Sequence, residues 1–173
     1  PATRRCWSPR WKPWRGGTGA CDELRSYLDM QALPEARRAK VLPYIRDWVA
    51  TGARLSAADV FTGYSQMAAL RDAAVNACQP FDFVLSPTSP VPSYAAEWAS
   101  PTNDASAPFE HIAFTVPHNM SEQPALSINC GFTADGLPIG LQIVGHRFDD
   151  LGVLQMGLAW EQLRPAMPAW PMG

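Results

Sequence analysis

The sequence is poor in the residues that build metal sites, disulfide frameworks and membrane spans. It contains three histidines, and its four cysteines lie far apart with no CxxC pair. A zinc site or a disulfide scaffold is therefore not expected, and reduced thiols of the cytosol are the better interpretation. No apolar run approaches the roughly 18–20 residues that a membrane helix needs. We expect a cytoplasmic protein with no membrane partner, no metal and no cofactor.

Positive charge is concentrated at the start of the chain. The first twenty residues hold five of the fourteen Lys and Arg, three tryptophans and no acidic residue, although the net charge of the chain is −2. Basic residues interleaved with aromatic residues can clamp single-stranded nucleic acid. The alternative is an irregular end, since proline and Gly16-Gly17 break regular structure and no apolar signal segment is present. We interpret residues 1–21 as an irregular basic Trp/Pro-rich start and expect no nucleic-acid partner.

From Asp22 to Cys78 the apolar residues recur at helical spacing. A first helix is predicted from Asp22 to about Leu33, and Pro34 can start a second because proline is tolerated in a first helical turn. Pro43 can start a third helix that ends near Gly52. Ser56 with Asp59 resembles a capping box and opens a longer helix to about Cys78. The residues that we expect this longer helix to bury are Val60, Tyr64, Met67, Ala68 and Val75.

The second half of the chain reads as strands, a long loop and one more helix. Residues 81–85 form a short apolar run, and residues 87–108 are a loop rich in Pro, Ser and Ala, followed by a possible short helix over 110–118. A loop this long in a compact domain is usually functional. Two further apolar runs, 125–130 and 139–144, flank a turn at Asp135-Gly136 and predict a hairpin. Helical spacing returns over 149–163.

These elements predict an α/β fold. The hairpin strands are nearly continuous in apolar content, which is typical of strands that are covered on both faces. The helices of residues 22–78 and 149–163 are available to cover them. We therefore expect a partial mixed sheet of about three strands covered by helices.

Histidine and serine residues are the natural candidates for catalysis. His111, His118 and His146 ordinarily titrate near neutrality. A Ser-His-Asp group could join Ser121 or Ser127 to His118 and Asp104. No serine stands in a GxSxG elbow, however, which is the signature of one such hydrolase group. We interpret the histidines as structural.

Two other pairs invite a catalytic interpretation. Cys130 could pair with His118, but a cysteine buried in a strand is commonly inert. Asp149 and Asp150 could act as paired carboxylates, but at a helix start acidic residues interact favourably with unpaired amides. We interpret Cys130 as a buried core residue and the two aspartates as a helix cap.

Several motifs resemble the C-terminal end of the amidase signature family. The resemblance covers about residues 22–164, leaves residues 165–173 as a tail, and implies the C-terminal part of an α/β/α fold. Its most specific element is the glycine- and proline-containing strand motif of the second hairpin strand. The matching segments are FDFVLSPT (81–88), FTVPHN (114–119), PALS (124–127), GF (131–132), GLPIGLQIVG (136–145), DDL (149–151) and WEQ (160–162).

The resemblance implies hydrolysis of a carboxylic amide through an acyl-enzyme. The family uses a serine nucleophile, a second serine in a cis peptide and a lysine that moves protons, with the oxyanion held by a GGSSGG-like loop. This chain contains only Lys12 and Lys40, neither in the family's lysine context, and no such loop. No catalytic residue is carried over, and we expect the chain to be inactive alone.

The resemblance also implies that this part of the family contributes a wall of the substrate pocket. Thr88, Asn119 and Ser121 are the predicted substrate-binding residues. Their alternative roles are structural, because Thr88 can close a turn and Asn119 can cap a helix. Two positions depart from the family: Ser121-Glu122 replaces a small residue and glycine, and Ile112 replaces the aspartate of the tRNA-dependent glutamine amidotransferase branch.

Three functions from different classes remain open. The chain is expected to be a C-terminal fragment of a hydrolase that cleaves a small amide. Alternatively, it is a non-catalytic subunit that docks on a partner carrying the catalytic N-terminal portion, or that forms a homo-oligomer. The least favoured is a nucleic-acid-binding module through residues 1–20.

Overall fold

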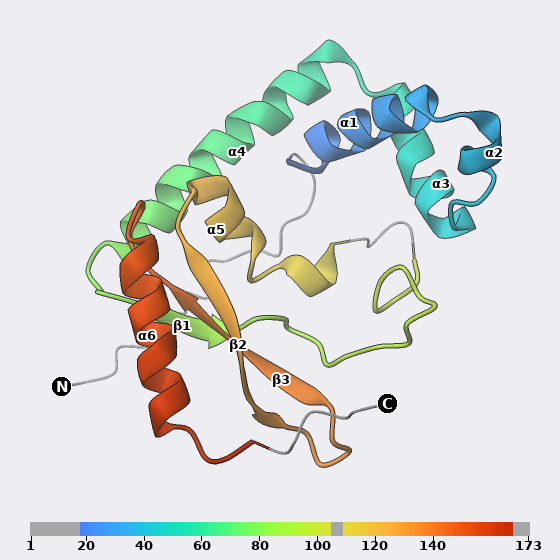
Figure 1. The fold of residues 1–173 in the computed structure, drawn as a ribbon. Helices are drawn as coiled ribbons and strands as arrows, with labels where there is room; N and C mark the ends of the chain where they lie inside the picture. The colour runs from blue at the N-terminus through green and yellow to red at the C-terminus, as the bar shows by residue number, and fades with distance from the viewer. Residues whose placement is uncertain (1–17, 105–108, 168–173) are drawn as a thin grey trace.

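The computed structural model describes residues 18–104 and 109–167, and it confirms the predicted α/β class (Figure 1). The expectations for residues 1–17, including nucleic-acid binding, and for 168–173 lie outside the described residues. The elements in order are α1 (Thr18–Ala32), α2 (Glu35–Arg38), α3 (Pro43–Thr51), the 3-10 turn η1 (Gly52–Arg54), α4 (Ala57–Cys78), β1 (Val84–Pro87), the 3-10 turn η2 (Glu110–Ile112), α5 (Val116–Ser121), β2 (Ala125–Phe132), β3 (Pro138–Val144) and α6 (Asp150–Leu163).

The sheet has the order β1-β3-β2, and both of its pairings are antiparallel. Among the described residues the expected mixed character is therefore wrong. The turn between β2 and β3 is too short for the crossover that a parallel pair requires, so these strands must be antiparallel. Gly136 lies in this turn with φ +80°, a conformation that favours glycine. β1 then pairs with the other edge of β3, placing Ser86 and Ser127 on opposite sides of Gln142.

The first three helices pack away from the sheet. α1 contacts α3 and α4, and Figure 1 shows α1, α2 and α3 grouped at the end of α4 that is farther from the sheet. α1 begins at Thr18, four residues before the predicted start at Asp22. Gly19 of this first turn is buried, although glycine disfavours a helix by its propensity. The helices of the N-terminal half therefore do not provide the expected cover of both sheet faces.

α4 begins with the predicted capping box. The Asp59 amide donates to Ser56 Oγ at 3.2 Å, and the Ser56 amide donates to Asp59 Oδ2 at 2.9 Å. The predicted buried face is only partly correct, because Tyr64 and Ala68 are exposed. α4 has α1 beside one half and α5 beside the other, which leaves its opposite side to solvent. Its fully buried residues are Gly63, Ala74 and Cys78.

α6 packs on one face of the sheet and encloses the centre of the core. Ile143 and Val153 are 0% and 3% exposed, and Val144, which points to the other face of β3, is 1% exposed. Asp149 is the N-cap of the helix, as predicted, and its Oδ1 accepts a hydrogen bond from the Gly152 amide at 3.0 Å. Near the other end, the Trp160 indole donates to the Asn129 carbonyl at 3.5 Å.

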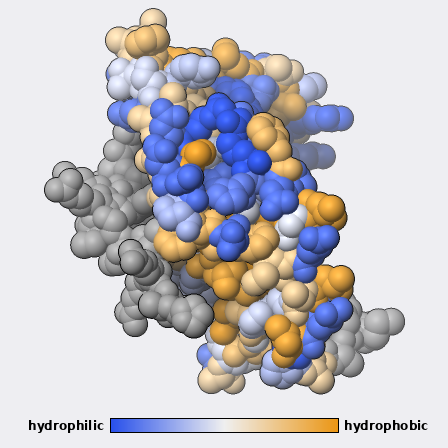
Figure 2. Space-filling view, turned by 90° about the vertical axis from the view of Figure 1, so that its left-hand side faces the viewer, coloured by the Kyte–Doolittle hydropathy of each residue, from blue (hydrophilic) through white to orange (hydrophobic). Residues whose placement is uncertain are grey.

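The outer side of α6 is apolar and exposed. Leu151, Leu154 and Leu158 are 67%, 60% and 56% exposed, and their spacing places them on one stripe of the helix. Figure 2 shows this side of the molecule, where hydrophobic residues gather below a hydrophilic patch. None of the helices in the described ranges is long and apolar enough to span a membrane.

The two faces of the hairpin are not equally covered, contrary to the expectation. Exposure alternates along the first half of β2, with Ala125 and Ser127 exposed and Leu126 and Ile128 half-buried. Cys130 is exposed rather than buried, and its thiol donates weakly to the Ile139 carbonyl at 3.4 Å. The strands are apolar on both sides by sequence, but α6 supplies cover on only one.

The long loop of residues 88–104 contains no helix or strand, as predicted. It is held against α3, because the Tyr44 hydroxyl donates to the fully buried Ser100 hydroxyl at 3.0 Å. The helix predicted over 110–118 divides into η2 and α5. The loop thus runs from the end of β1 to the helical half of the molecule (Figure 1).

Candidate functional site

A hollow of about 710 Å³ lies between the sheet and the long loop. Ser127 lines it, whereas the preceding residue, Leu126, contacts Gly157 of α6. Since successive strand residues point to opposite faces, the hollow is on the face of the sheet that α6 does not cover. This hollow is our candidate functional site, because it is concave and polar groups of several elements meet in it.

Two hydroxyl groups meet on the floor of the hollow. Thr88 Oγ1 and Ser127 Oγ are 2.8 Å apart, although Thr88 follows β1 and Ser127 belongs to β2, on either side of β3. Gly140 of β3 makes this contact possible. A Cβ atom at position 140 would lie 2.7 Å from Thr88 Oγ1 and 3.4 Å from Ser127 Oγ. The Thr88 amide also donates to the Gly140 carbonyl at 2.9 Å, which holds Thr88 in place.

Two aromatic side chains form a wall of the hollow next to the hydroxyl pair. The rings of Tyr94 and His111 both line the hollow and meet edge to face, with centroids 5.9 Å apart. Nδ1 of His111 is buried and has no hydrogen-bond partner within the described part of the chain. On the same face of β3 as Gly140, the Gln142 side chain donates to Ser86 Oγ at 3.1 Å and to the Phe114 carbonyl at 2.9 Å. The polar face of the sheet is therefore tied to the segment that precedes α5.

The structure separates the three predicted substrate-binding residues. Thr88 lines the hollow, whereas Asn119 and Ser121 are not among the described residues that line it. Asn119 is exposed on α5, and Ser121 is fully buried with its hydroxyl donating to Gln123 Oε1 at 2.9 Å. Binding of a substrate by these residues stays a prediction.

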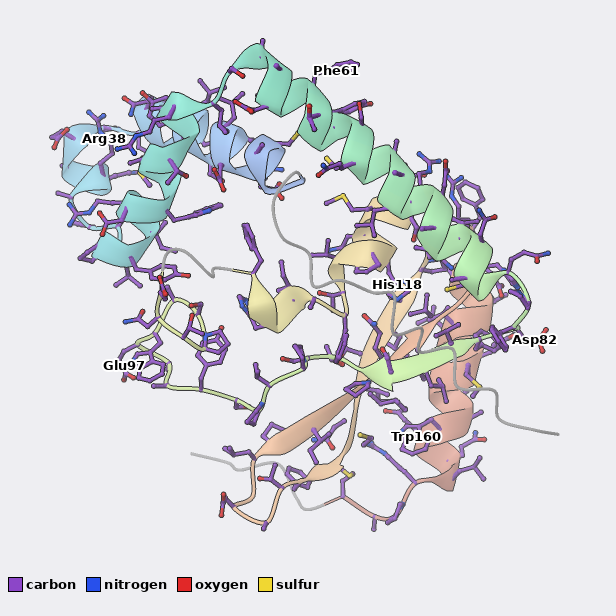
Figure 3. The ribbon with its side chains drawn as sticks, turned by 180° about the vertical axis from the view of Figure 1, so that it is seen from behind. Arg38, Phe61, Asp82, Glu97, His118 and Trp160 are labelled. Carbon is purple, nitrogen blue, oxygen red and sulfur yellow. The ribbon has the colours of Figure 1, made fainter. Side chains whose placement is uncertain are left out.

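Within the described residues, the predicted serine nucleophiles are not hydrogen-bonded to a histidine ring that could act as their base. The Ser121 hydroxyl donates to the main-chain carbonyl of His118 at 3.3 Å, not to its ring. Burial lowers the pKa of His118, partly offset by a side-chain hydrogen bond with Gln123. His118 lies on α5, which packs against α4, and it is not among the described residues that line the hollow (Figure 3). Its surroundings are those of a structural side chain, not of a catalytic base.

The pairing of Ser127 with Thr88 was not predicted from the sequence, and neither was the role of Gly140. One signal was present, because Ser127 is a small polar residue between Leu126 and Ile128. The missing information was the strand order, which alone brings β1 and β2 to the two sides of β3. The described residues contain no group of three or more His, Cys, Asp or Glu side chains that could hold a metal ion.

Comparison with known proteins places the chain in a family. The model of the family described as Amidase matches residues 18–154. A glutamyl-tRNA(Gln) amidotransferase subunit of Myxococcus xanthus (strain DK1622) is 40% identical over 93 residues, which cover 54% of this chain and 19% of that protein. The protein of the same name from Thermodesulfovibrio yellowstonii is 38% identical over 89 residues, or 51% of this chain and 18% of its own.

Solved structures share the fold. A structure described as an amidase has a TM-score of 0.69 at 22% identity and covers 83% of this chain and 33% of its own. The 6-aminohexanoate cyclic dimer hydrolase has a TM-score of 0.62 at 21% identity, covering 86% and 36%. The chain thus spans about a fifth of the length of the curated relatives and about a third of these structures. The family model matches well over half of the sequence, and the chain belongs to the amidase family.

Proposed function

We propose that this chain is the C-terminal, substrate-wall part of an amidase-family hydrolase and that by itself it does not turn over an amide. The observation that carries the proposal is the hollow beside Thr88 and Ser127, whose two hydroxyl groups hydrogen-bond to each other and, among the described residues, to no histidine or lysine side chain. An acyl-enzyme requires a nucleophile within hydrogen-bond reach of a base. Lys40, the one lysine of the described residues, is exposed and does not line the hollow.

The exposed surfaces support the presence of a second polypeptide segment or partner protein that supplies the catalytic residues. Among the described residues, β1 and β2 each have one edge without a strand partner. The leucine stripe of α6, with Leu151, Leu154 and Leu158, adds exposed apolar area. Unpaired strand edges and apolar patches of this kind are typical of surfaces that another element covers. The free thiols of Cys21 and Cys130 fit the cytoplasm as the compartment.

A chimaera tests the proposal. The matching 93-residue segment of the Myxococcus xanthus relative is replaced by the segment of this chain. We expect the chimaera to hydrolyse simple amides, and we expect the isolated chain to show neither turnover nor an acyl adduct by mass spectrometry. The relative with the segment deleted is the negative control. An acyl adduct on the isolated chain, or an inactive but folded chimaera, contradicts the proposal.

The names of the relatives favour a second candidate, in which the parent protein releases ammonia from glutamine for a tRNA-bound glutamyl group. The supporting observation is the 40% identity to a protein named as part of such an amidotransferase. Ile112, which lines the hollow, argues against this candidate because an apolar side chain does not pair with an ammonium group. The same chimaera distinguishes the two candidate functions when its hydrolysis of glutamine is compared with its hydrolysis of simple amides.

A further inference from the structure

We infer that the hollow binds an uncharged amide with an apolar group, such as an aryl amide, and that the Thr88 and Ser127 hydroxyls contact the amide. This inference rests on the proposed function and adds the class of substrate. It also adds Ser127 and Gly140 to the residues that determine specificity.

The lining of the hollow carries no charged side chain among the described residues. None of those that line it is Asp, Glu, Lys or Arg. Placing a carboxylate or an ammonium group against an uncharged lining removes its hydration without supplying a counter-charge, which is strongly unfavourable. A substrate with a charged group at this position would therefore be rejected.

The walls of the hollow suit an apolar group of moderate size. A volume of about 710 Å³ is in the usual range for small-molecule pockets. The Tyr94 ring presents an aromatic surface, and aromatic groups pack favourably against one another edge to face or offset. The larger apolar side chains that complete the walls are Pro87, Pro90, Val91, Pro92, Ile112 and Ile139.

The floor of the hollow has unused hydrogen-bonding capacity. A hydroxyl has one donor hydrogen and two acceptor lone pairs. The Thr88–Ser127 pair uses one hydrogen and one lone pair in its 2.8 Å contact, and these two hydroxyls have no other hydrogen bond among the described residues. One donor and several acceptor sites remain. An amide, with a carbonyl acceptor and an N–H donor on adjacent atoms, matches this pair.

Gly140 sets the depth of the floor. The chain at Gly140 has no positive φ, so alanine is allowed there by the backbone. Its methyl group would nevertheless press on both Thr88 Oγ1 and Ser127 Oγ and separate the two hydroxyls. Gly140→Ala is therefore a direct probe of the pair, and Ser127→Ala removes one hydroxyl without adding volume.

The test is an NMR titration of the ¹⁵N-labelled chain at about pH 8, where free imidazole is neutral. The probes are benzamide, para-carbamoylbenzoate with a negative charge, and para-aminomethylbenzamide with a positive charge. We expect benzamide to bind at least about tenfold more tightly than either charged probe, with shifts at Ser127 and Gly140. Gly140→Ala and Ser127→Ala should each weaken benzamide binding at least about threefold. Ser65→Ala on α4, away from the hollow, should leave the affinity for benzamide unchanged.

The inference is overturned if a charged probe binds as tightly as benzamide, if benzamide does not bind, or if both variants bind it normally. Failure of the proposed function gives a different result. The chimaera would then lack turnover even though benzamide binds in the hollow of the isolated chain. The two failures are therefore distinguishable.

Discussion

Gly157 of α6 lies directly against the Leu126 side chain of β2. A Cβ atom at position 157 would overlap Cδ2 of Leu126, so the absence of a side chain at Gly157 lets the helix approach the sheet closely. This approach buries Val153 and the centre of β3. It also assigns the two sheet faces, because Ser127, which follows Leu126 along β2 and points to the other face, lines the hollow.

We expect Gly157→Val to lower the free energy of unfolding by about 2–3 kcal/mol, because overpacking at this contact displaces the helix from the sheet. Glycine and valine are both weak helix formers, so propensity contributes little to the difference. Urea unfolding is the measurement. The control is Gln155→Val on the exposed side of α6, which should change stability by less than about 0.5 kcal/mol. Equal effects of the two substitutions would contradict the contact.

Glu122 joins α4 to the segment that follows β3. Its carboxylate pairs with Arg71 at 3.2 Å and with Arg147, and its backbone has φ +59°. Because these side chains are about a third or more exposed, we expect Glu122→Gln to cost less than about 1 kcal/mol of unfolding free energy. High salt should shrink the difference from the wild type.

Glu122→Gly separates charge from backbone conformation. It removes the same ion pairs, but glycine adopts the left-handed conformation without the roughly 1 kcal/mol penalty of other residues. We therefore expect Glu122→Gly to be more stable than Glu122→Gln in urea unfolding at low salt. The reverse order would show that the φ of this residue carries no strain.

His118 should make stability depend on pH below neutrality. Burial lowers its pKa in the folded chain, partly offset by the Gln123 hydrogen bond, whereas the unfolded chain keeps the ordinary value of about 6.5. Between these two values the unfolded state binds more protons. Stability is therefore fully present above about pH 6.5 and is lost as the pH falls toward the folded-state pKa. Urea unfolding at several pH values measures the loss, and His118→Gln should remove it. His146→Gln, at an exposed position, should not.

The capping box of α4 should hold Asp59 ionised in mild acid. Hydrogen bonds from the Ser56 side chain and then from its amide lower the pKa of Asp59. Stability from this cap is present above the ordinary value of about 3.9 and is lost as the pH falls through the lower folded-state pKa. In Ser56→Ala we expect the pKa of Asp59 to rise toward its ordinary value, as measured by carboxyl NMR titration. Ser65→Ala is the matched control within the same helix. An unchanged pKa in Ser56→Ala would contradict the role of the hydroxyl.

Short local motifs, each made of residues close together in the sequence, correctly predicted where helices begin and where the hairpin turns. Pro43, Ser56 with Asp59, Gly136 and Asp149 each stand where the structure starts, caps or turns an element. Such features act within one turn of chain, so no distant partner is needed. The amidase resemblance rests on the same kind of local pattern, and the family model confirms it.

Predictions of burial, which depend on contacts between residues far apart in the sequence, were less successful. The sequence predicts burial of Tyr64 and Cys130, yet both are exposed in the structure. α1 begins before Asp22, and the Cys21 thiol in its first turn donates to the Val60 carbonyl of α4. Burial depends on neighbours, and a spacing of apolar residues along one segment does not reveal which neighbours are present.

The sequence by itself determined the α/β elements, their caps and turns, and membership of the amidase family. Only the tertiary structure decided that the sheet is antiparallel, that α6 covers only one of its faces, and that Thr88 and Ser127 meet over Gly140. The reason is physical. Caps and turns are settled by hydrogen bonds between residues a few positions apart, whereas a floor built from β1, β2 and β3 exists only once strand order and register have joined segments about forty residues apart.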